Sequence, residues 1–344
     1  MTTFNPNDIG QSNGNLFGLP ANYQQAEVVV LPVPWDVTVS YGDGTSSAPE
    51  RILEESLQVD LFDLDYCNFW EQGIYYLKSS EEIEEKCQIT RPYAIEAIKL
   101  LEKGNQIDSN STLQKNTEKV NKACGEMIDW IQSEAMKLIL DQKKVVLLGG
   151  DHSTPLGYLK ALDSKNESFG ILQIDAHCDL RESYEGFEYS HASIMYNAMK
   201  LKNISSLTQV GIRDFCEAEI DFAHKSSKPI HIFYDRIMQY QRFEGKTWKL
   251  ICEDIIKTLP QSVYISFDID GLKPSYCPNT GTPVAGGLEI DEVFYLFNLV
   301  KASGRKIIGM DLNEVGSEVW DANVGARVLY RMLGLWMSKN ESKN

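Results

Sequence analysis

The stretch "FGILQIDAHCD" (residues 169–179) joins an almost continuous apolar run to a cluster of polar side chains. A short apolar run of this kind is typical of a strand that is buried on both faces. Directly after it, Asp175, His177 and Asp179 stand at alternate positions. Side chains at alternate positions of an extended segment point the same way, so we expect these three to converge just beyond a sheet.

Similar apolar runs recur along the chain and fix the fold class. Seven can be read, at residues 26–35, 144–150, 169–175, 207–214, 231–235, 263–270 and 306–315. Segments with a helical pattern separate several of them. Apolar strands that alternate with helices indicate a parallel sheet covered on both faces. We therefore predict an α/β fold, a three-layer α/β/α sandwich around a mostly parallel sheet of about eight strands.

The rest of the chain is organised around this one predicted domain, at residues 26–340. Residues 1–25 are polar and are expected to form an N-terminal arm. Residues 79–117 are a possible insertion, in which residues 105–116 look like a polar loop. Residues 118–141 have the apolar spacing of a long amphipathic helix.

The composition limits which binding partners and which cellular compartment are expected. Lys and Arg total 33 and Asp and Glu total 49, which gives a formal net charge of −16. This acidic balance argues against nucleic acid or an anionic membrane and suits a small cationic ligand. The seven cysteines form no CxxC pair, and no signal peptide or membrane-spanning apolar stretch can be read. We expect a cytoplasmic protein with reduced thiols.

Polar residues also follow three other apolar runs. Asp151 and His152 follow the run at residues 144–150. The runs at residues 263–270 and 306–315 each end in a pair of acidic residues, Asp268 with Asp270 and Asp311 with Glu314. Ligands of open α/β sheets bind beyond the carboxyl ends of the strands. The polar clusters are therefore expected to meet at one edge of the sheet.

Such a cluster is expected to hold metal ions. Several close carboxylates repel one another, and two divalent cations would offset four negative charges. A set of oxygen and nitrogen ligands without thiolate suits Mn²⁺ or a similar ion, and two such ions with a bridging water can generate a nucleophile. The alternative is structural, because a single Asp at a strand end is often a helix cap or turn former. Cys178 is expected to point away from the ions and to fill the core.

The polar blocks resemble the ureohydrolases, the arginase and agmatinase family, over about residues 26–335. The matching blocks are "GGDHS" (149–153), "DAHCD" (175–179), "SFDIDGLKPSYCPNTGTPVAGGL" (266–288) and "DLNEV" (311–315). The resemblance implies an arginase-like fold and a single catalytic domain. It also implies a homo-oligomer, either a trimer or a hexamer.

The resemblance further implies a binuclear metal centre and roles for particular residues. Two divalent ions, Mn²⁺ in the first place and Ni²⁺ as an alternative, would be held by His152, Asp175, His177, Asp179, Asp268 and Asp270. A hydroxide bridging the ions would attack a guanidinium carbon, and Asp179 would pass a proton to the leaving nitrogen. His191 would shuttle protons to solvent, with the near-neutral pKa that is usual for imidazole. Glu314 would pair with the guanidinium group, and Thr282, Asp311 and Arg181 complete the expected substrate site.

Departures from the family pattern bear on the substrate. The last block continues as Glu314-Val315-Gly316-Ser317, where the family usually has Glu-Val-Asn-Pro. The stretch "LRESYEGFEYSH" (180–191) lacks the polar residues with which arginases hold an α-amino acid. We therefore expect an agmatinase, which converts agmatine to putrescine and urea. Arg181 could instead hold a substrate carboxylate, or form an ion pair with Glu182 or Glu185.

Several alternatives stay open at this stage. Guanidine hydrolase, guanidinobutyrase and formimidoylglutamase share the same chemistry. A zinc-dependent amide hydrolase of the deacetylase type is more remote, because its site holds one catalytic metal. A non-catalytic relative is the last alternative, and it would not need to keep all six ligands.

Overall fold

The computed structural model describes residues 4–20, 22–165 and 167–338, and within these residues eight strands form one sheet. The strand order is β2-β1-β3-β8-β7-β4-β5-β6, and all neighbouring strands are parallel. The strands are β1 (Val28–Val33), β2 (Ile74–Tyr76), β3 (Lys144–Gly149), β4 (Phe169–Ile174), β5 (Ile204–Ile212), β6 (Ile230–Tyr234), β7 (Ser262–Asp268) and β8 (Lys306–Asn313).

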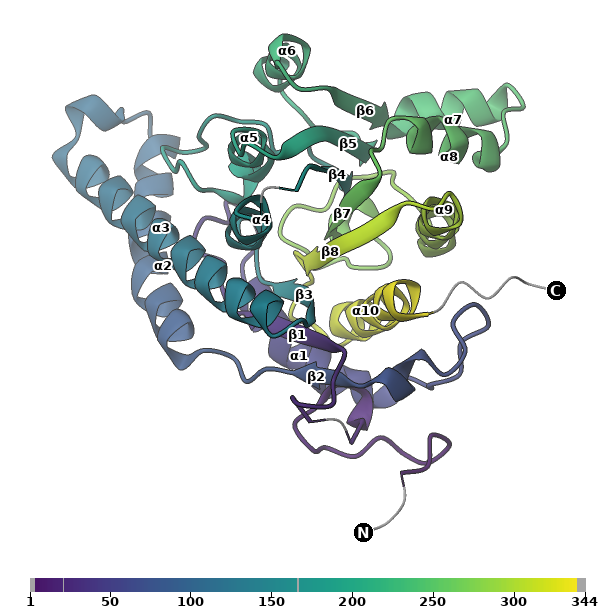
Figure 1. The fold of residues 1–344 in the computed structure, drawn as a ribbon. Coiled ribbons are helices and arrows are strands. Elements are labelled where there is room, and N and C mark those ends of the chain that lie inside the picture. The colour runs from purple at the N-terminus through teal and green to yellow at the C-terminus, as the bar shows by residue number, and fades with distance from the viewer. Residues whose placement is uncertain (1–3, 21, 166, 339–344) are drawn as a thin grey trace.

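Helices cover both faces of the sheet (Figure 1). The first face carries α2 (Glu81–Glu102), α3 (Ser111–Leu140), α4 (Pro155–Asp163), α5 (Ile194–Met199) and α6 (Glu217–Lys225). The second carries α1 (Ala48–Glu55), α7 (Asp235–Phe243), α8 (Trp248–Lys257), α9 (Ile290–Ala302) and α10 (Val319–Met337).

Each face of the sheet has its own apolar core, because alternate residues of a strand point to opposite sides. In β1, Val28 and Val30 pack with the second group of helices, whereas Val29 and Leu31 pack with the first. All four side chains are almost fully buried. The predicted three-layer sandwich is therefore confirmed, with a sheet that is wholly rather than mostly parallel.

All seven apolar runs contain strands of the sheet. The eighth strand, β2, could not be read as a run because it has only three residues. The helices α6, α7 and α8 were also not predicted. Each is at most ten residues long, so its apolar spacing repeats only a few times.

The prediction of a polar loop at residues 105–116 is wrong for its second half. The helix α3 begins at Ser111, because the side chain of Asn110 accepts hydrogen bonds from the N–H groups of Thr112 and Leu113, both at 3.0 Å. The helices α2 and α3 form an antiparallel hairpin along one side of the molecule (Figure 1). Ile83 of α2 is buried in the same core as the sheet, so the hairpin packs as part of the first helical layer.

The described part of the predicted arm is irregular, and Leu16 and Phe17 near its end are buried in the core. Residues 1–3 and 21 of that arm, and 339–340 of the predicted domain, lie outside the described residues. The domain boundaries themselves remain a prediction.

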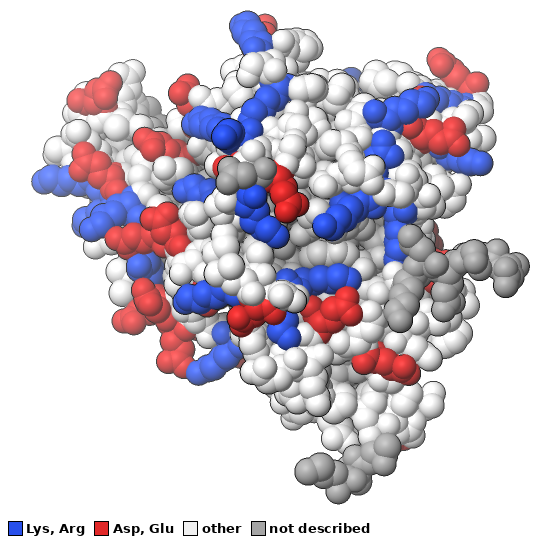
Figure 2. Space-filling model, viewed as in Figure 1, with Lys and Arg blue, Asp and Glu red and all other residues white. Residues whose placement is uncertain are grey.

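The surface carries both signs of charge. Figure 2 shows Lys and Arg side chains across the middle of one face and acidic side chains around them. Lys144 and Lys306 stand at the amino ends of β3 and β8, opposite to the edge where the predicted acidic cluster lies. In the part of the chain that is described, no helix is long and apolar enough to cross a membrane.

The close packing of α3 against α4 depends on Gly157. A Cβ atom at this position would lie 2.5 Å from the Ile128 carbonyl oxygen and 2.6 Å from Ile131 Cβ. We therefore expect Gly157→Ala to lower the free energy of unfolding by about 1–3 kcal/mol, measured by urea denaturation. Gly125→Ala in α3 is the matched control, since its Cβ would meet nothing closer than 4.0 Å. This control is expected to gain about 0.5–1 kcal/mol. Equal gains in both variants would contradict the proposed close packing.

Candidate metal centre

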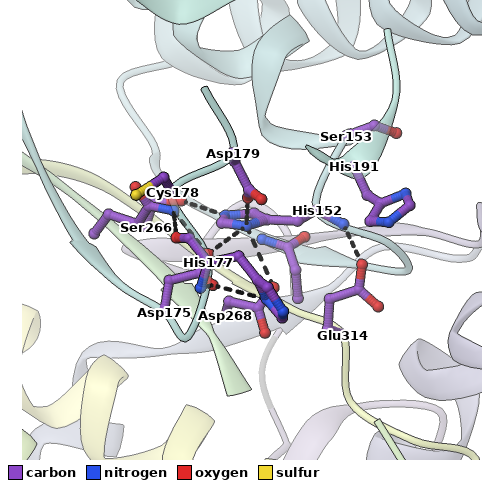
Figure 3. Close-up of polar contacts among 12 residues, drawn as sticks. His152, Ser153, Asp175, His177, Cys178, Asp179, His191, Ser266, Asp268 and Glu314 are labelled. Atoms are coloured by element: carbon purple, nitrogen blue, oxygen red, sulfur yellow. Dashed lines mark hydrogen bonds and ion pairs between the residues drawn. The ribbon is translucent and has the colours of Figure 1, made fainter. Parts of the chain in front are cut away.

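Four adjacent strands in the middle of the sheet, β3, β8, β7 and β4, deliver the polar clusters to one place. Because all are parallel, their carboxyl ends lie at the same edge. His152 follows β3, Asp175 follows β4, Asp268 ends β7 and Glu314 follows β8. Figure 3 shows these side chains gathered around the imidazole of His152.

The first group of predicted metal ligands surrounds His152 Nδ1. This atom lies 3.0 Å from Asp175 Oδ2, 2.9 Å from Asp179 Oδ2 and 3.3 Å from Asp268 Oδ2. It is buried, yet it has no hydrogen-bond partner among the described residues. Four donor atoms thus face a common point without being joined by hydrogen bonds, which is the arrangement that suits a cation.

The second group shares Asp175 with the first. His177 Nδ1 lies 3.0 Å from Asp270 Oδ2 and 3.6 Å from Asp175 Oδ1. Asp270 Oδ2 is also buried and has no hydrogen-bond partner in the described part of the chain. Five of the six predicted ligands therefore form two groups that share Asp175, each able to hold one metal ion. The sixth, Asp268, lies beside the first group, 3.3 Å from His152 Nδ1.

The physical reason for this convergence differs from the expected one. The strand β4 ends at Ile174, and Asp179 adopts a left-handed backbone conformation with φ 54°, so the segment does not stay extended. Hydrogen bonds from backbone N–H groups fold it instead: His177 N–H donates to Asp175 Oδ1 at 2.6 Å, and Ala176 N–H donates to Asp270 Oδ1 at 3.0 Å. Cys178 is fully buried in the apolar core, as predicted.

Burial and the repulsion between neighbouring carboxylates disfavour the ionised form of several carboxyl groups in this cluster. Burial, and then the charge of Asp175, raise the pKa of Asp179 to about 7. Burial, followed by the charges of Asp270 and Asp175, raises the pKa of Asp268 well above its usual range. The pKa of Asp175 is lowered in spite of burial, because both His152 and His177 contact it. Divalent cations would supply the missing positive charge, and the oxygen and nitrogen donors fit Mn²⁺, Ni²⁺ or a similar ion.

A second set of contacts fixes the orientation of His152. Its Nε2 lies 2.9 Å from Ser266 Oγ, and Ser266 Oγ donates to Asp311 Oδ1 at 3.0 Å. Since the hydroxyl group of Ser266 donates to Asp311, Ser266 Oγ accepts a hydrogen bond from His152 Nε2–H. The lone pair of His152 is then on Nδ1, facing the carboxylates, as a metal ligand requires.

Asp311 was expected in the substrate site, but the structure does not bring it to the cavity. It is fully buried within β8, and its carboxylate holds Ser266 and Asn313. Asp311 therefore supports His152 from beneath. Ser266 was not predicted, although it stands two residues before Asp268 in β7 and so points to the same side.

A cavity of about 270 Å³ opens over the metal ligands. Its wall includes two of the ligands, His177 and Asp179, and three residues that were predicted for the site, namely His191, Thr282 and Arg181. The other wall residues were not predicted individually. They come from the segments that follow β1, β4, β5 and β7 and from α6, and are Ser40, Tyr41, Tyr184, Ala192, Asp214, Phe215, Glu219, Pro283 and Val284.

His191 lies in the wall of this cavity, and its pKa is well below that of a free imidazole. Burial lowers its pKa to about 3, and positive charge on His177 and His152 acts in the same direction. Its imidazole is therefore neutral at pH 7, which corrects the expectation of a near-neutral pKa. The backbone N–H of His191 donates to Thr38 Oγ1 at 3.2 Å.

Glu314 is buried beside His152 and His191 (Figure 3). Its Oε1 accepts the His152 N–H at 2.9 Å, whereas Oε2 has no hydrogen-bond partner among the described residues. A Cβ atom at Gly281 would lie 2.8 Å from Oε2, so the glycine leaves room beside this buried oxygen. Glu314 itself does not line the cavity. Burial and the charge of Asp151 raise the pKa of Glu314 well above its usual range.

Arg181 does not pair with Glu182 or Glu185, as one interpretation of the sequence expected. Its Nε lies 3.9 Å from Glu219 Oε2, and its guanidinium group stands 4.8 Å from the ring centre of Tyr184. The side chain is 35% exposed and lies in the cavity wall.

Comparisons with known proteins agree with this site. The family model described as Arginase family matches residues 26–334. The chain belongs to the arginase family. It is an arginase-family hydrolase that acts on the C–N bonds of linear amidines.

Named relatives cover almost the whole chain. An N(1)-aminopropylagmatine ureohydrolase of Synechocystis sp. is 29% identical over 330 residues, which are 94% of this chain and 93% of that protein. An agmatinase of Halalkalibacterium halodurans is 30% identical over 295 residues, 86% of each chain. The solved structure of the agmatine ureohydrolase of Thermoplasma volcanium has the same fold, with a TM-score of 0.69, 23% identity and 95% coverage of each chain.

Ser266 gives a test of the metal centre of this arginase-family protein. Removing a group that orients a metal-ligating His commonly costs about 10–100-fold in metal affinity. We expect Ser266→Ala to weaken Mn²⁺ binding by about this factor, measured by isothermal titration calorimetry. Ser262→Ala, at the other end of β7, is the control and should bind Mn²⁺ like the wild type. Unchanged affinity in Ser266→Ala would show that His152 is not a ligand held in this way.

Proposed function

We propose that this arginase-family enzyme is an agmatinase, which hydrolyses agmatine to putrescine and urea with two divalent cations. Mn²⁺ is the expected ion and Ni²⁺ the alternative. The observation that carries the proposal is the pair of ligand groups that share Asp175, directly beneath a cavity with an exposed carboxylate in its wall. A deacetylase-type hydrolase would need only one such group.

The roles of the residues follow from their positions. When bound, the two cations would lower the pKa of a water molecule and so supply a nucleophile at neutral pH. Asp179 lies in both the first ligand group and the cavity wall, so its carboxylate can carry a proton to the leaving nitrogen. The Glu314 carboxyl group has the planar geometry to pair with a guanidinium group, whose positive charge would favour the ionised carboxylate in spite of its burial. Neutral His191 can then exchange a proton with solvent through the cavity.

The cavity wall favours a substrate with a cationic tail. Asp214 presents a carboxylate that is 68% exposed, next to Phe215 and near His177. The tail ammonium group of agmatine would pair with this carboxylate. The substrate named for the Synechocystis relative, N(1)-aminopropylagmatine, has a longer cationic tail and is the second candidate.

Arg181 is the one observation that favours a different substrate. It is a cation in the same wall and could hold the carboxylate of guanidinobutyrate or formimidoylglutamate. However, its charge is partly offset by Glu219, and its guanidinium group already contacts Tyr184. A cationic tail at Asp214 therefore remains the better supported proposal, and free guanidine, which has no tail, would use neither residue.

We also propose that the enzyme works in the cytoplasm as a homo-oligomer, a trimer or a hexamer. All seven cysteines are free thiols, which suits a reducing compartment. The oligomeric state rests on family membership alone.

The decisive experiment is a urea-release assay on enzyme loaded with Mn²⁺ or Ni²⁺. Agmatine, N(1)-aminopropylagmatine, guanidinobutyrate, arginine and guanidine are compared side by side. We expect the highest kcat/KM with agmatine, and no turnover in Asp179→Asn with any substrate. A preference for guanidinobutyrate or guanidine would refute the agmatine proposal, and full activity of Asp179→Asn would refute the assigned role of this carboxylate.

Two cavity residues test the substrate tail separately from the chemistry. Asp214→Asn is expected to raise KM for agmatine by about 1.4- to 5-fold, because an exposed ion pair contributes about 0.2–1 kcal/mol. Its kinetics with tail-less guanidine should not change. The matched variant Arg181→Gln should leave the KM for agmatine unchanged or slightly lower. The opposite pattern, with agmatine binding impaired only in Arg181→Gln, would contradict the cationic-tail interpretation.

A further inference from the structure

The α2–α3 hairpin contacts one of the cavity-wall loops through Arg91, a half-buried residue in the middle of α2. Arg91 Nη1 donates to the carbonyl oxygen of Val37 at 3.0 Å and to that of Val39 at 2.7 Å. These two carbonyl groups belong to the loop that follows β1. A charged donor makes each of these hydrogen bonds stronger than a neutral one would.

Thr38 lies between the two carbonyl groups that Arg91 holds, and its side chain is fully buried. Its Oγ1 donates to Asp151 Oδ2 at 3.3 Å and accepts the backbone N–H of His191 at 3.2 Å. A hydroxyl group can donate once and accept at the same time. The position of His191 therefore depends on the position of Thr38.

The same loop forms one wall of the cavity. Ser40 and Tyr41 line it, and Gly42 N–H donates to the Gly281 carbonyl oxygen at 3.0 Å. Farther along, Asp36 Oδ2 accepts the N–H of Gly44 at 2.9 Å. These contacts hold the far part of the loop, whereas residues 37–39 are held from outside by Arg91.

We propose that Arg91 is a positioning residue, which clamps residues 37–39 and, through Thr38, fixes the imidazole of His191 over the metal ligands. The kinetic part of this inference rests on the proposed function. Its structural part, the clamp itself, does not.

The hairpin also supports a second segment of the cavity wall, through Asn121 of α3. Its Nδ2 donates to the Gly186 carbonyl oxygen at 3.1 Å, and its Oδ1 accepts the Glu188 N–H at 2.9 Å. This second loop carries Arg181 and Tyr184 into the cavity. Arg91 therefore holds the segment whose Thr38 contacts the His191 backbone, whereas Asn121 holds residues 186–188 of the loop that carries Arg181 and Tyr184. We expect the loss of these two contacts to have different kinetic effects.

The kinetic test compares Arg91→Met and Arg91→Lys with a matched control. A displacement of about 1 Å in an active site can cost about 10²-fold in rate. We expect Arg91→Met to lower kcat for urea release by about 10–100-fold, with KM and Mn²⁺ content changed less than about twofold. Arg91→Lys, which keeps the charge, should recover part of the loss. Asn121→Ala should instead raise KM for agmatine and change kcat little.

The control is Lys86→Met, which removes the 2.8 Å ion pair between Lys86 of α2 and Glu126 of α3 without touching either loop. It should keep the wild-type kcat. If Lys86→Met and Arg91→Met lose kcat equally, the effect is general loosening of the hairpin and the proposal is wrong. Wild-type kcat in Arg91→Met would also overturn it.

Amide hydrogen exchange, followed by mass spectrometry, tests the clamp without any activity. Arg91→Met should exchange faster than the wild type in peptides that cover residues 37–41 and the His191 amide, while Lys86→Met should not. If the wild type releases no urea, the proposed function fails, yet this measurement still decides the clamp. Unchanged exchange in Arg91→Met would overturn it. If Arg91→Met does not fold, Arg91→Lys is compared with the wild type by the same two measurements.

Discussion

The need to balance buried negative charge is the constraint on which this structure depends. Seven carboxyl groups are almost fully buried at one edge of the sheet, namely Asp151, Asp175, Asp179, Asp268, Asp270, Asp311 and Glu314. Hydrogen bonds from backbone N–H groups satisfy some of their oxygens, but the pKa values of Asp179, Asp268 and Glu314 are all raised. Cations at the two ligand groups would remove this penalty, so metal binding and folding of the loops at this edge are expected to be coupled.

The parallel sheet is what makes such a concentration possible. Its strands all end at the same edge, and β3, β8, β7 and β4 are held from both sides by separate apolar cores. The candidate ligands are thus attached to strands that are buried on both faces. The contacts of His152 with Ser266, and of Ser266 with Asp311, connect the imidazole ring to these strands.

Much of this arrangement could be read from the sequence because it depends on local pattern. The apolar runs identified seven strands, and the polar residues after them include the five that form two candidate ligand groups sharing Asp175, with Asp268 beside them. What local pattern could not give is contact between distant segments. The pairing of Arg181 with Glu219, the place of Asp311 beneath His152 and the low pKa of His191 all depend on tertiary packing. The left-handed conformation of Asp179 shows the same limit. We expected Asp175, His177 and Asp179 to converge because they alternate along an extended segment, but backbone hydrogen bonds fold this segment instead.

The chemistry and the substrate preference therefore have different structural origins. The metal ligands come from strand ends, whereas the residues that would meet a substrate tail, such as Tyr41, Tyr184 and Asp214, come from loops. Two of these loops are held by the α2–α3 hairpin rather than by the sheet. A change in the hairpin or in a loop can then alter which guanidino compound fits, while the metal centre stays the same. This separation explains why the sequence points to six candidate metal ligands with far less ambiguity than to one substrate.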